Sequence, residues 1–225
     1  MVMKKIMGFA LAFMFSTALF AQGITTASAY FKQISEYYGT LKDYEVEFEL
    51  KVNKKDSSGT LCYKSPNLIR LDYTKPADQV IVFNGDKLIV YLSEQEASLE
   101  QEISSSTGVS PVSTTTPQSL ALMTRYYTVA YETGQDAVPL DDGSNEMVIK
   151  FILERKSTSE AFKYLKIAVS EGTNLIRRLE AVTPKGDSFI FNFYEYKVNS
   201  GITDQRFIYD APATADVYSN FLFSE

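Results

Sequence analysis

The sequence contains no histidine and only one cysteine, Cys62, among its 225 residues. The lack of histidine excludes a Ser-His-Asp triad, a histidine-ligated zinc site and acid-base catalysis by an imidazole. A single cysteine cannot form a disulfide within the chain, and strand-forming neighbours predict that Cys62 is an inert core thiol. Stability must therefore come from an apolar core, which 15 Phe and 15 Tyr residues can supply.

The chain also has fewer positive than negative charges: it contains 22 Lys and Arg residues and 28 Asp and Glu residues, which give a net charge of −6. An acidic chain is a poor ligand for phosphate backbones, so we expect no nucleic-acid partner. Asp141 and Asp142 lack the D-x-D-x-D-G spacing of a calcium loop and predict a plain turn. We therefore expect no metal and no cofactor, although chemistry based on carboxylates or lysine alone stays open.

Long apolar runs are absent, with one exception at residues 6–20, where a short basic region precedes the run and Ala21 follows it. This pattern is typical of a secretory signal peptide. The run is shorter than the roughly 20 residues that a membrane-spanning helix needs, and no basic stop-transfer flank follows. We expect residues 1–21 to be the signal peptide, although Ala27-Ser-Ala29 fits the cleavage rule better. Cleavage there would remove half of a predicted helix, so we expect residues 22–225 to be one soluble, exported domain.

Two segments have the periodicity of amphipathic helices. In residues 25–42, Phe31, Ile34 and Tyr38 recur at intervals of three and four and form one apolar stripe. Residues 119–127 predict a second helix, with Leu120 and Met123 along one side and Pro117 near its start. Both stripes have to be buried against another part of the chain.

Most of the remaining chain predicts β-strands. Residues 44–53 alternate strictly, with Val46, Phe48 and Leu50 on one face and glutamates on the other. Residues 59–91 predict four short strands, the last two joined by a hairpin at Asn84-Gly85. Further strands are predicted over 97–103, 146–155, 164–170, 175–183, 188–198 and 205–209, and residues 104–116 predict a mobile Ser/Thr-rich loop.

About ten antiparallel strands with two helical insertions predict an α+β fold that is mainly β. Sheets of this size tend to curl, and helices laid across the concave side would bury their stripes. We therefore expect a strongly curved antiparallel sheet that forms an incomplete β-barrel, with the helices over its concave face and an apolar space between. The same pattern is also compatible with a completely filled interior.

The region from Gly59 to Tyr91 resembles the periplasmic outer-membrane lipoprotein carriers, the LolA-type family. The order and spacing of its residues match the family pattern at Gly59, Lys64, Pro66, Arg70, Tyr73, Pro76, Gln79, Ile81, Val82, Asn84, Gly85 and Tyr91. The closing segments agree more loosely, at residues 186–191, 199–203, Phe207, Ala211-Pro212 and Asp216-Val217. With the export signal, the resemblance covers nearly all of the predicted mature chain.

The resemblance implies a monomeric periplasmic carrier rather than an enzyme. Such carriers receive acylated lipoproteins from an ABC transporter in the inner membrane and pass them to an acceptor at the outer membrane. The implied acyl-binding cavity wall consists of Val46, Phe48, Leu50, Tyr63, Ile69, Leu71, Val82, Val90, Ile149 and Phe151. The implied lid helices contribute Phe31, Ile34, Tyr38, Leu120 and Met123.

The chain departs from the family at two positions. The family has an arginine directly before the proline of the second strand, where it holds the lid closed, whereas this chain has Ser65. Lys64 lies one residue earlier, and a one-residue offset turns a strand side chain to the opposite face. A tryptophan that is common two residues before the tyrosine is replaced by Leu71. How the lid is fastened therefore stays open.

Two other functions compete with transport. Envelope-stress sensors share this half-barrel and use its pocket to detect lipid, although they usually carry a second domain. A carboxylate-dependent hydrolase is the third hypothesis, and no motif supports it. The acidic run at Glu94, Glu96, Glu100 and Glu102 predicts a solvated or edge strand, and it could also dock a basic partner.

Overall fold

The computed structural model describes residues 25–103 and 116–221. The predicted signal peptide and nearly all of the predicted loop over 104–116 lie outside these residues. Within the two described ranges, no helix is both long and apolar enough to cross a membrane.

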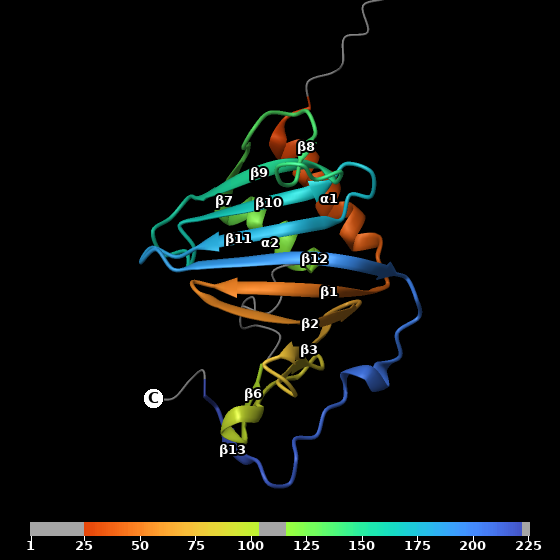
Figure 1. Ribbon diagram of the computed structural model, residues 1–225, viewed down its shortest axis with the longest axis vertical. Coiled ribbons are helices and arrows are strands. Elements are labelled where there is room, and N and C mark those ends of the chain that lie inside the picture. Colours follow the sequence, from red (N-terminus) through yellow and green to blue (C-terminus); the bar gives the residue numbers. More distant parts are fainter. Residues whose placement is uncertain (1–24, 104–115, 222–225) are drawn as a thin grey trace, which may run out of the picture.

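One large open sheet organises the molecule (Figure 1). Its strands follow the spatial order β13-β6-β5-β4-β3-β2-β1-β12-β11-β10-β9-β7, and β8 pairs with β9. All pairs are antiparallel except β13 with β6. The strands are β1 (Asp43–Val52), β2 (Lys55–Lys64), β3 (Leu68–Lys75), β4 (Val80–Phe83), β5 (Lys87–Leu92), β6 (Ala97–Glu102), β7 (Tyr127–Tyr131), β8 (Val138–Pro139), β9 (Met147–Arg155), β10 (Tyr164–Ser170), β11 (Ile176–Val182), β12 (Ser188–Val198) and β13 (Asp216–Ser219).

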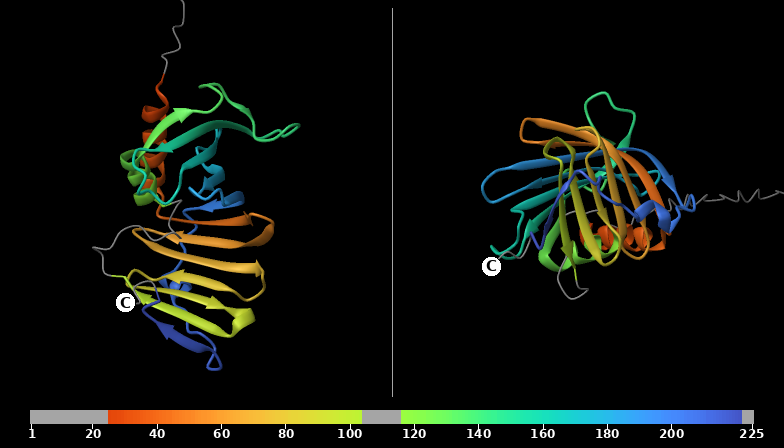
Figure 2. Two further views of the ribbon diagram at one scale, coloured as in Figure 1. Left: turned by 90° about the vertical axis from the view of Figure 1, so that its left-hand side faces the viewer. Right: turned by 90° about the horizontal axis from the view of Figure 1, so that it is seen from below.

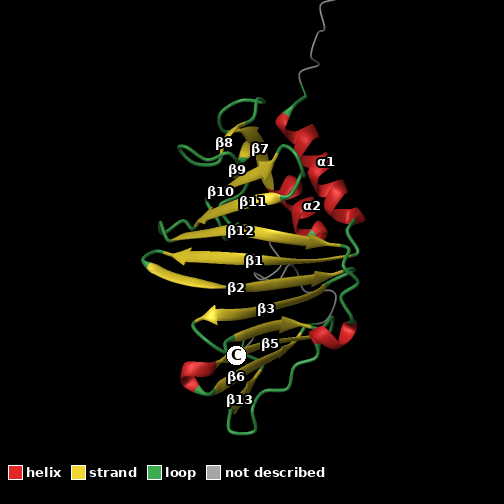
Figure 3. Ribbon diagram, turned by 45° about the vertical axis from the view of Figure 1, so that its right-hand side comes forward, coloured by secondary structure: helices red, strands yellow, loops and turns green. Residues whose placement is uncertain are grey.

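Two α-helices lie on the concave side of the sheet, beside the half that contains β7 and β9–β12 (Figures 2 and 3). Helix α1 spans Ala27–Thr40 and helix α2 spans Pro117–Tyr126. Each begins at a threonine whose hydroxyl accepts a backbone N–H of the first turn, Thr26 from Ala29 and Thr116 from Ser119. The predicted fold class is thereby confirmed: a mainly β structure whose curved sheet stays open, with both helices on its concave face.

Two local irregularities bend the sheet. A Cβ at Gly59 of β2 would overlap the carbonyl oxygen of Asp72, so only glycine permits β3 to approach this closely. In β12, an extra residue opposite Val46 forms a bulge at Glu195, which has a φ of 48°. Because of this bulge, both Phe193 and Tyr196 pack against the core, which strict alternation would forbid.

After β12 the chain crosses the outer, convex face as a strap of residues 199–215, which contains the 3₁₀ helix η3 (Asp204–Phe207). The prediction of a strand over 205–209 was therefore wrong. The final strand is β13 instead, and its parallel pairing is possible because the strap returns it to the far end of the sheet (Figure 3).

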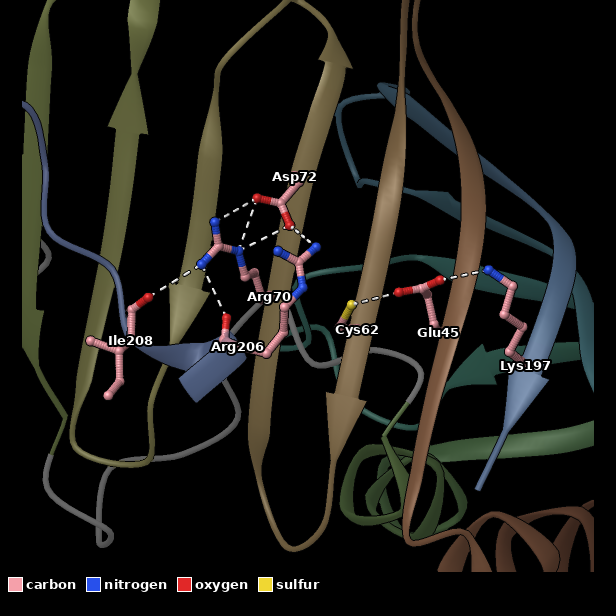
Figure 4. A network of polar contacts seen from close by, with 7 residues as sticks. All are labelled: Glu45, Cys62, Arg70, Asp72, Lys197, Arg206 and Ile208. Atoms are coloured by element: carbon pink, nitrogen blue, oxygen red, sulfur yellow. Dashed lines mark hydrogen bonds and ion pairs between the residues drawn. The ribbon is translucent and has the colours of Figure 1, made fainter. Parts of the chain in front are cut away.

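Polar contacts fasten this strap to the sheet (Figure 4). Arg70 of β3 donates to the carbonyl oxygens of Arg206 at 3.0 Å and Ile208 at 3.3 Å. Asp72 lies between two guanidinium groups, 2.8 Å from Arg70 and 2.7 Å from Arg206. Phe207, within the strap, is buried.

Other sequence predictions need smaller corrections. The described residues form a sheet of 13 strands. The sequence predicted about ten and did not identify the short strands β7, β8 and β13. The Asn84-Gly85 hairpin is present, but its loop spans three residues, 84–86, and only Gly85 has a positive φ. The Asn84 side chain accepts the backbone N–H groups of Asp86 and Lys87 and holds this loop.

Candidate functional site

The concave face of the sheet and the apolar stripes of the two helices meet in one hydrophobic core. The predicted helix residues Phe31, Ile34, Tyr38, Leu120 and Met123 all belong to it. So do eight of the predicted wall residues, namely Val46, Phe48, Leu50, Tyr63, Ile69, Leu71, Ile149 and Phe151. Alternation in β1, β2, β3 and β9 places the eight wall residues on a single face of the sheet.

Val82 does not lie on this face, and its prediction as a wall residue was wrong. It pairs directly with Arg70, whose side chain lies on the convex face under the strap, and paired residues share a face. Ile81 and Phe83 point to the concave side instead. The sequence could not distinguish them, because β4 is apolar on both faces. Val90 pairs with Ile81 and shares the concave face, where it is half-buried.

Beneath the helices the core is filled with aromatic side chains. Phe31 and Phe151 are fully buried, with ring centroids 5.6 Å apart, and Tyr131 stacks on Phe151 at 5.5 Å. Tyr44 stacks on Tyr63 at 5.0 Å. These mutually contacting rings, most of them buried, lie between the helices and the sheet, where the sequence predicted an apolar space.

Away from the helices, the concave side is only partly covered. We call this region the open concave surface; its half-buried apolar residues are Val52, Tyr73, Ile81, Phe83, Phe189 and Phe191. They are continuous with the core, because Phe48 contacts Tyr73 at 5.2 Å and Phe191 at 6.1 Å between ring centroids. Burial raises the pKa of Tyr73 to about 12, as expected for a phenol in apolar surroundings.

The two helices are held to the sheet very differently. Tyr38 of α1 is fully buried, and its hydroxyl accepts the backbone N–H of Ile176 at 2.9 Å. Tyr196 donates to the carbonyl oxygen of the same residue at 2.9 Å. Burial raises the pKa of Tyr38 to about 12, so the hydroxyl stays protonated at neutral pH. Helix α1 is therefore pinned to β11 and β12 by a buried polar contact.

Helix α2 is fastened at both ends by exposed hydrogen bonds. Gln118 donates to the carbonyl oxygen of Pro66 at 2.6 Å, in the turn between β2 and β3. At the other end, Lys156 donates to the last-turn carbonyl oxygens of Thr124 and Arg125 at 3.0 and 3.2 Å. Neither contact has a signal in the sequence, because both join polar residues distant along the chain.

The turn that contains Ser65 thus touches α2, but through its backbone. The Pro66 carbonyl oxygen also accepts a hydrogen bond from the Tyr63 hydroxyl at 3.1 Å, and the backbone N–H of Ser65 donates to the carbonyl oxygen of Lys42 at 2.8 Å. Lys64 points away and forms an ion pair with Asp204 of the strap. The sequence predicts Ser65 and Lys64 as lid contacts, and of these two the structure places only the turn at Ser65 against α2.

In the described part of the chain, no three His, Cys, Asp or Glu side chains gather in a group able to hold a metal ion. Cys62 is buried on the convex face, and its thiol donates to Glu45 at 3.7 Å. Burial raises the pKa of this thiol, opposed in part by Arg206. The site is therefore an apolar surface with hydrogen bonds at its margins.

Several known proteins share this architecture. An uncharacterised conserved protein from Thermus thermophilus superposes with a TM-score of 0.56, at 13% identity, over 85% of this chain and 98% of that one. MucB, in its complex with MucA from Pseudomonas aeruginosa, superposes with a TM-score of 0.51 at 12% identity. That match covers 85% of this chain but only 63% of the other, so MucB shares the fold within a longer protein.

Sequence comparison is more specific. The outer-membrane lipoprotein carrier protein of Pseudoalteromonas translucida is 22% identical over 190 residues, which cover 82% of this chain and 84% of the relative. The family model for the outer membrane lipoprotein carrier protein LolA matches residues 22–210. That match includes α1, α2, the open concave surface and most of the strap, and the chain therefore belongs to the LolA family.

Proposed function

We propose that this protein carries lipoproteins across the periplasm from the inner to the outer membrane and shields their acyl chains against the concave face of its sheet. The observation that carries the proposal is the open concave surface, a half-buried apolar area continuous with the core that the two helices cover, α2 being fastened at its ends by exposed hydrogen bonds. Membership of the LolA family supports the same role. The cargo would be delivered by an ABC transporter and taken up by an outer-membrane acceptor.

A carrier has to release its cargo, which limits how deeply it can bury an acyl chain. Shielding one CH₂ group stabilises by about 0.8 kcal/mol, so a fully buried 16-carbon chain would contribute roughly 12 kcal/mol. Several such chains would bind almost irreversibly. A surface that covers the chains only in part, with α2 as the movable cover, is compatible with transfer.

The first experiment asks whether lipid occupies the concave side. Protein purified gently from its own envelope is analysed by mass spectrometry for bound diacylglyceryl or lipoprotein species. Phe191→Glu should deplete this lipid, because it places a charge on the open concave surface. Ile190→Glu is the matched control, since Ile190 is also half-buried but lies on the opposite face of β12. Equal lipid in both variants would contradict the proposal.

The second experiment tests transport itself. The protein is depleted in cells, and the inner- and outer-membrane fractions are compared for lipoprotein content. Lipoproteins should accumulate in the inner membrane. Normal outer-membrane levels after depletion would rule out the transport role.

A lipid-sensing regulator is the alternative, favoured by the shared fold of MucB in its complex with MucA. A sensor would bind lipid and yet leave lipoprotein sorting unchanged on depletion. Lipid copurification combined with normal fractionation would therefore select the sensor over the carrier.

A further inference from the structure

The two ends of the sheet are protected to different degrees. At one end, α1 and α2 pack beside β7, and the Tyr131 hydroxyl donates to the carbonyl oxygen of Thr25 at 2.8 Å. At the other end lies β13, and within the described residues no strand pairs with its outer edge. Figures 1 and 3 show β13 at the extreme end of the sheet, far from both helices. Covering an edge with helices is a common protection against strand pairing, and among the described residues such a cover is found at the β7 end alone.

The backbone of β13 has hydrogen-bonding groups on its free side. The backbone N–H of Asp216 donates to the backbone carbonyl oxygen of Glu96, and that of Asn220 donates to the backbone carbonyl oxygen of Glu100, both at 2.8 Å. Since successive N–H groups of a strand point in opposite directions, those of Val217 and Ser219 point away from β6. All four residues of β13 are exposed, and the strand contains neither lysine nor proline. Lysine and proline on an edge strand usually discourage pairing with another strand.

The side chains on this edge are apolar and its surroundings are acidic. Val217 is 57% exposed and Tyr218 is 53% exposed, on opposite faces of the strand. Glu94, Glu96, Glu102 and Asp216 are exposed around them. The only basic side chain along β5, β6 and β13 is Lys87, and it already pairs with Glu100 at 2.9 Å.

We propose that the free edge of β13 binds an extended, basic segment of a partner protein, which adds to the sheet as a further strand. Main-chain hydrogen bonds to Val217 and Ser219 would provide affinity, and Val217 and Tyr218 would contact apolar residues of the added strand. The surrounding carboxylates select a basic partner. A second copy of this chain is disfavoured, because it would bring two acidic ends together. The inference does not depend on lipid binding, since this edge is remote from α1 and α2.

The experiment uses the mature protein and a fluorescent ten-residue peptide of alternating lysine and valine, with binding followed by fluorescence anisotropy. Val217→Pro removes the outward N–H without touching a bond to β6. Val217→Ala is the matched control, which loses the side chain but keeps the N–H. Loss of the hydrogen bond should weaken peptide binding in Val217→Pro by about fivefold or more relative to Val217→Ala. A peptide with glutamate in place of lysine should not bind.

Hydrogen exchange supplies the second measurement. The basic peptide should slow exchange of the Val217 and Ser219 amides, and added salt should reverse this protection. Equal affinity of the proline and alanine variants, or unchanged exchange at these two amides, would overturn the proposal. A concentration-dependent dimer that Val217→Pro abolishes would also overturn it, because a second copy would then occupy the edge. Copurified lipid, measured in parallel, should be the same in both variants.

Discussion

At the scale of single residues, a few buried polar atoms decide which parts of this apolar interior are fixed. The Tyr38 hydroxyl is the clearest example, because it satisfies a backbone N–H of β11 inside a core made largely of aromatic rings. A buried N–H without a partner is costly. This contact therefore specifies where α1 lies as well as adding to stability.

Replacing Tyr38 with phenylalanine should test this role. The buried N–H of Ile176 would lose its acceptor, and we expect the free energy of unfolding to fall by about 1–3 kcal/mol. Urea unfolding followed by circular dichroism measures the change. Tyr37→Phe is the control, since the Tyr37 side chain is only half-buried; a similar loss in both variants would refute a special role for Tyr38.

Gly59 should tolerate no side chain. Alanine there would push β2 away from the carbonyl oxygen of Asp72, and we expect destabilisation of about 1–3 kcal/mol, typical of overpacking. Gly172→Ala is the matched control, because no atom lies within 4 Å of a Cβ at that position. Thermal unfolding of the two variants should differ clearly, and equal melting temperatures would show that the sheet can relax here.

Cys62 gives a prediction that depends on pH. Burial raises its pKa in the folded state, so the folded protein holds this proton more tightly than the unfolded chain does. The resulting stability is present at neutral pH and lost as the pH rises above the ordinary thiol value of about 8.5. Unfolding midpoints at pH 7 and pH 9.5 should therefore differ less in Cys62→Ala than in the parent. An identical pH dependence would mean that the thiol does not contribute.

At the scale of elements, the contacts of the two helices predict that α1 stays fixed and that α2 is the one that moves. Helix α1 is anchored by Tyr38, whereas the turn between β2 and β3 reaches α2 through the exposed hydrogen bond from Gln118. Opening of the concave face should therefore begin with α2. The acceptor is the backbone carbonyl oxygen of Pro66, which belongs to the same turn as Ser65. The turn therefore fastens α2 through its backbone.

Gln118→Met should loosen α2, because methionine fills similar space but cannot donate to Pro66. Amide exchange over residues 117–126 should accelerate about fivefold, as expected for the loss of one hydrogen bond. A fluorescent fatty acid should also bind faster. Ala121→Gln changes an exposed position of the same helix and should alter neither rate. Unchanged exchange in Gln118→Met would show that packing alone holds α2.

Sequence patterns predicted these elements to different extents. Strict alternation identified the buried face of β1, and the spacing of Phe31, Ile34 and Tyr38 identified the buried face of α1. The face of Val82 could not be predicted, because it pairs with Arg70, whose strap partner Arg206 lies far along the chain. The hydrogen bonds of Gln118 and Tyr196 could not be predicted either. The first requires the turn between β2 and β3 to lie beside α2, and the second requires the bulge in β12.

At the scale of the whole molecule, the strap ties the last part of the chain to strands from its first half. Asp72 is central, because it joins Arg70 of β3 to Arg206 of η3. Asp72→Asn would leave two half-buried guanidinium groups with weaker partners, and we expect a loss of about 1–3 kcal/mol. Hydrogen exchange over residues 203–219 should accelerate. Asp210→Asn, at an exposed strap position, is the control; equal exchange in both would exclude the network as the fastening.

The parallel pairing of β13 with β6 has a consequence for biogenesis. The predicted signal peptide implies that the chain crosses the inner membrane from its N-terminus, so β6 would emerge long before residues 216–219. Throughout that interval β6 would be an unpaired edge, and Tyr91 would lack its ring contact with Tyr209 of the strap. Incompletely folded molecules would then aggregate most readily through the edge of β6. Loss of residues 216–219, by proteolysis or a premature stop codon, would leave this edge unpaired permanently.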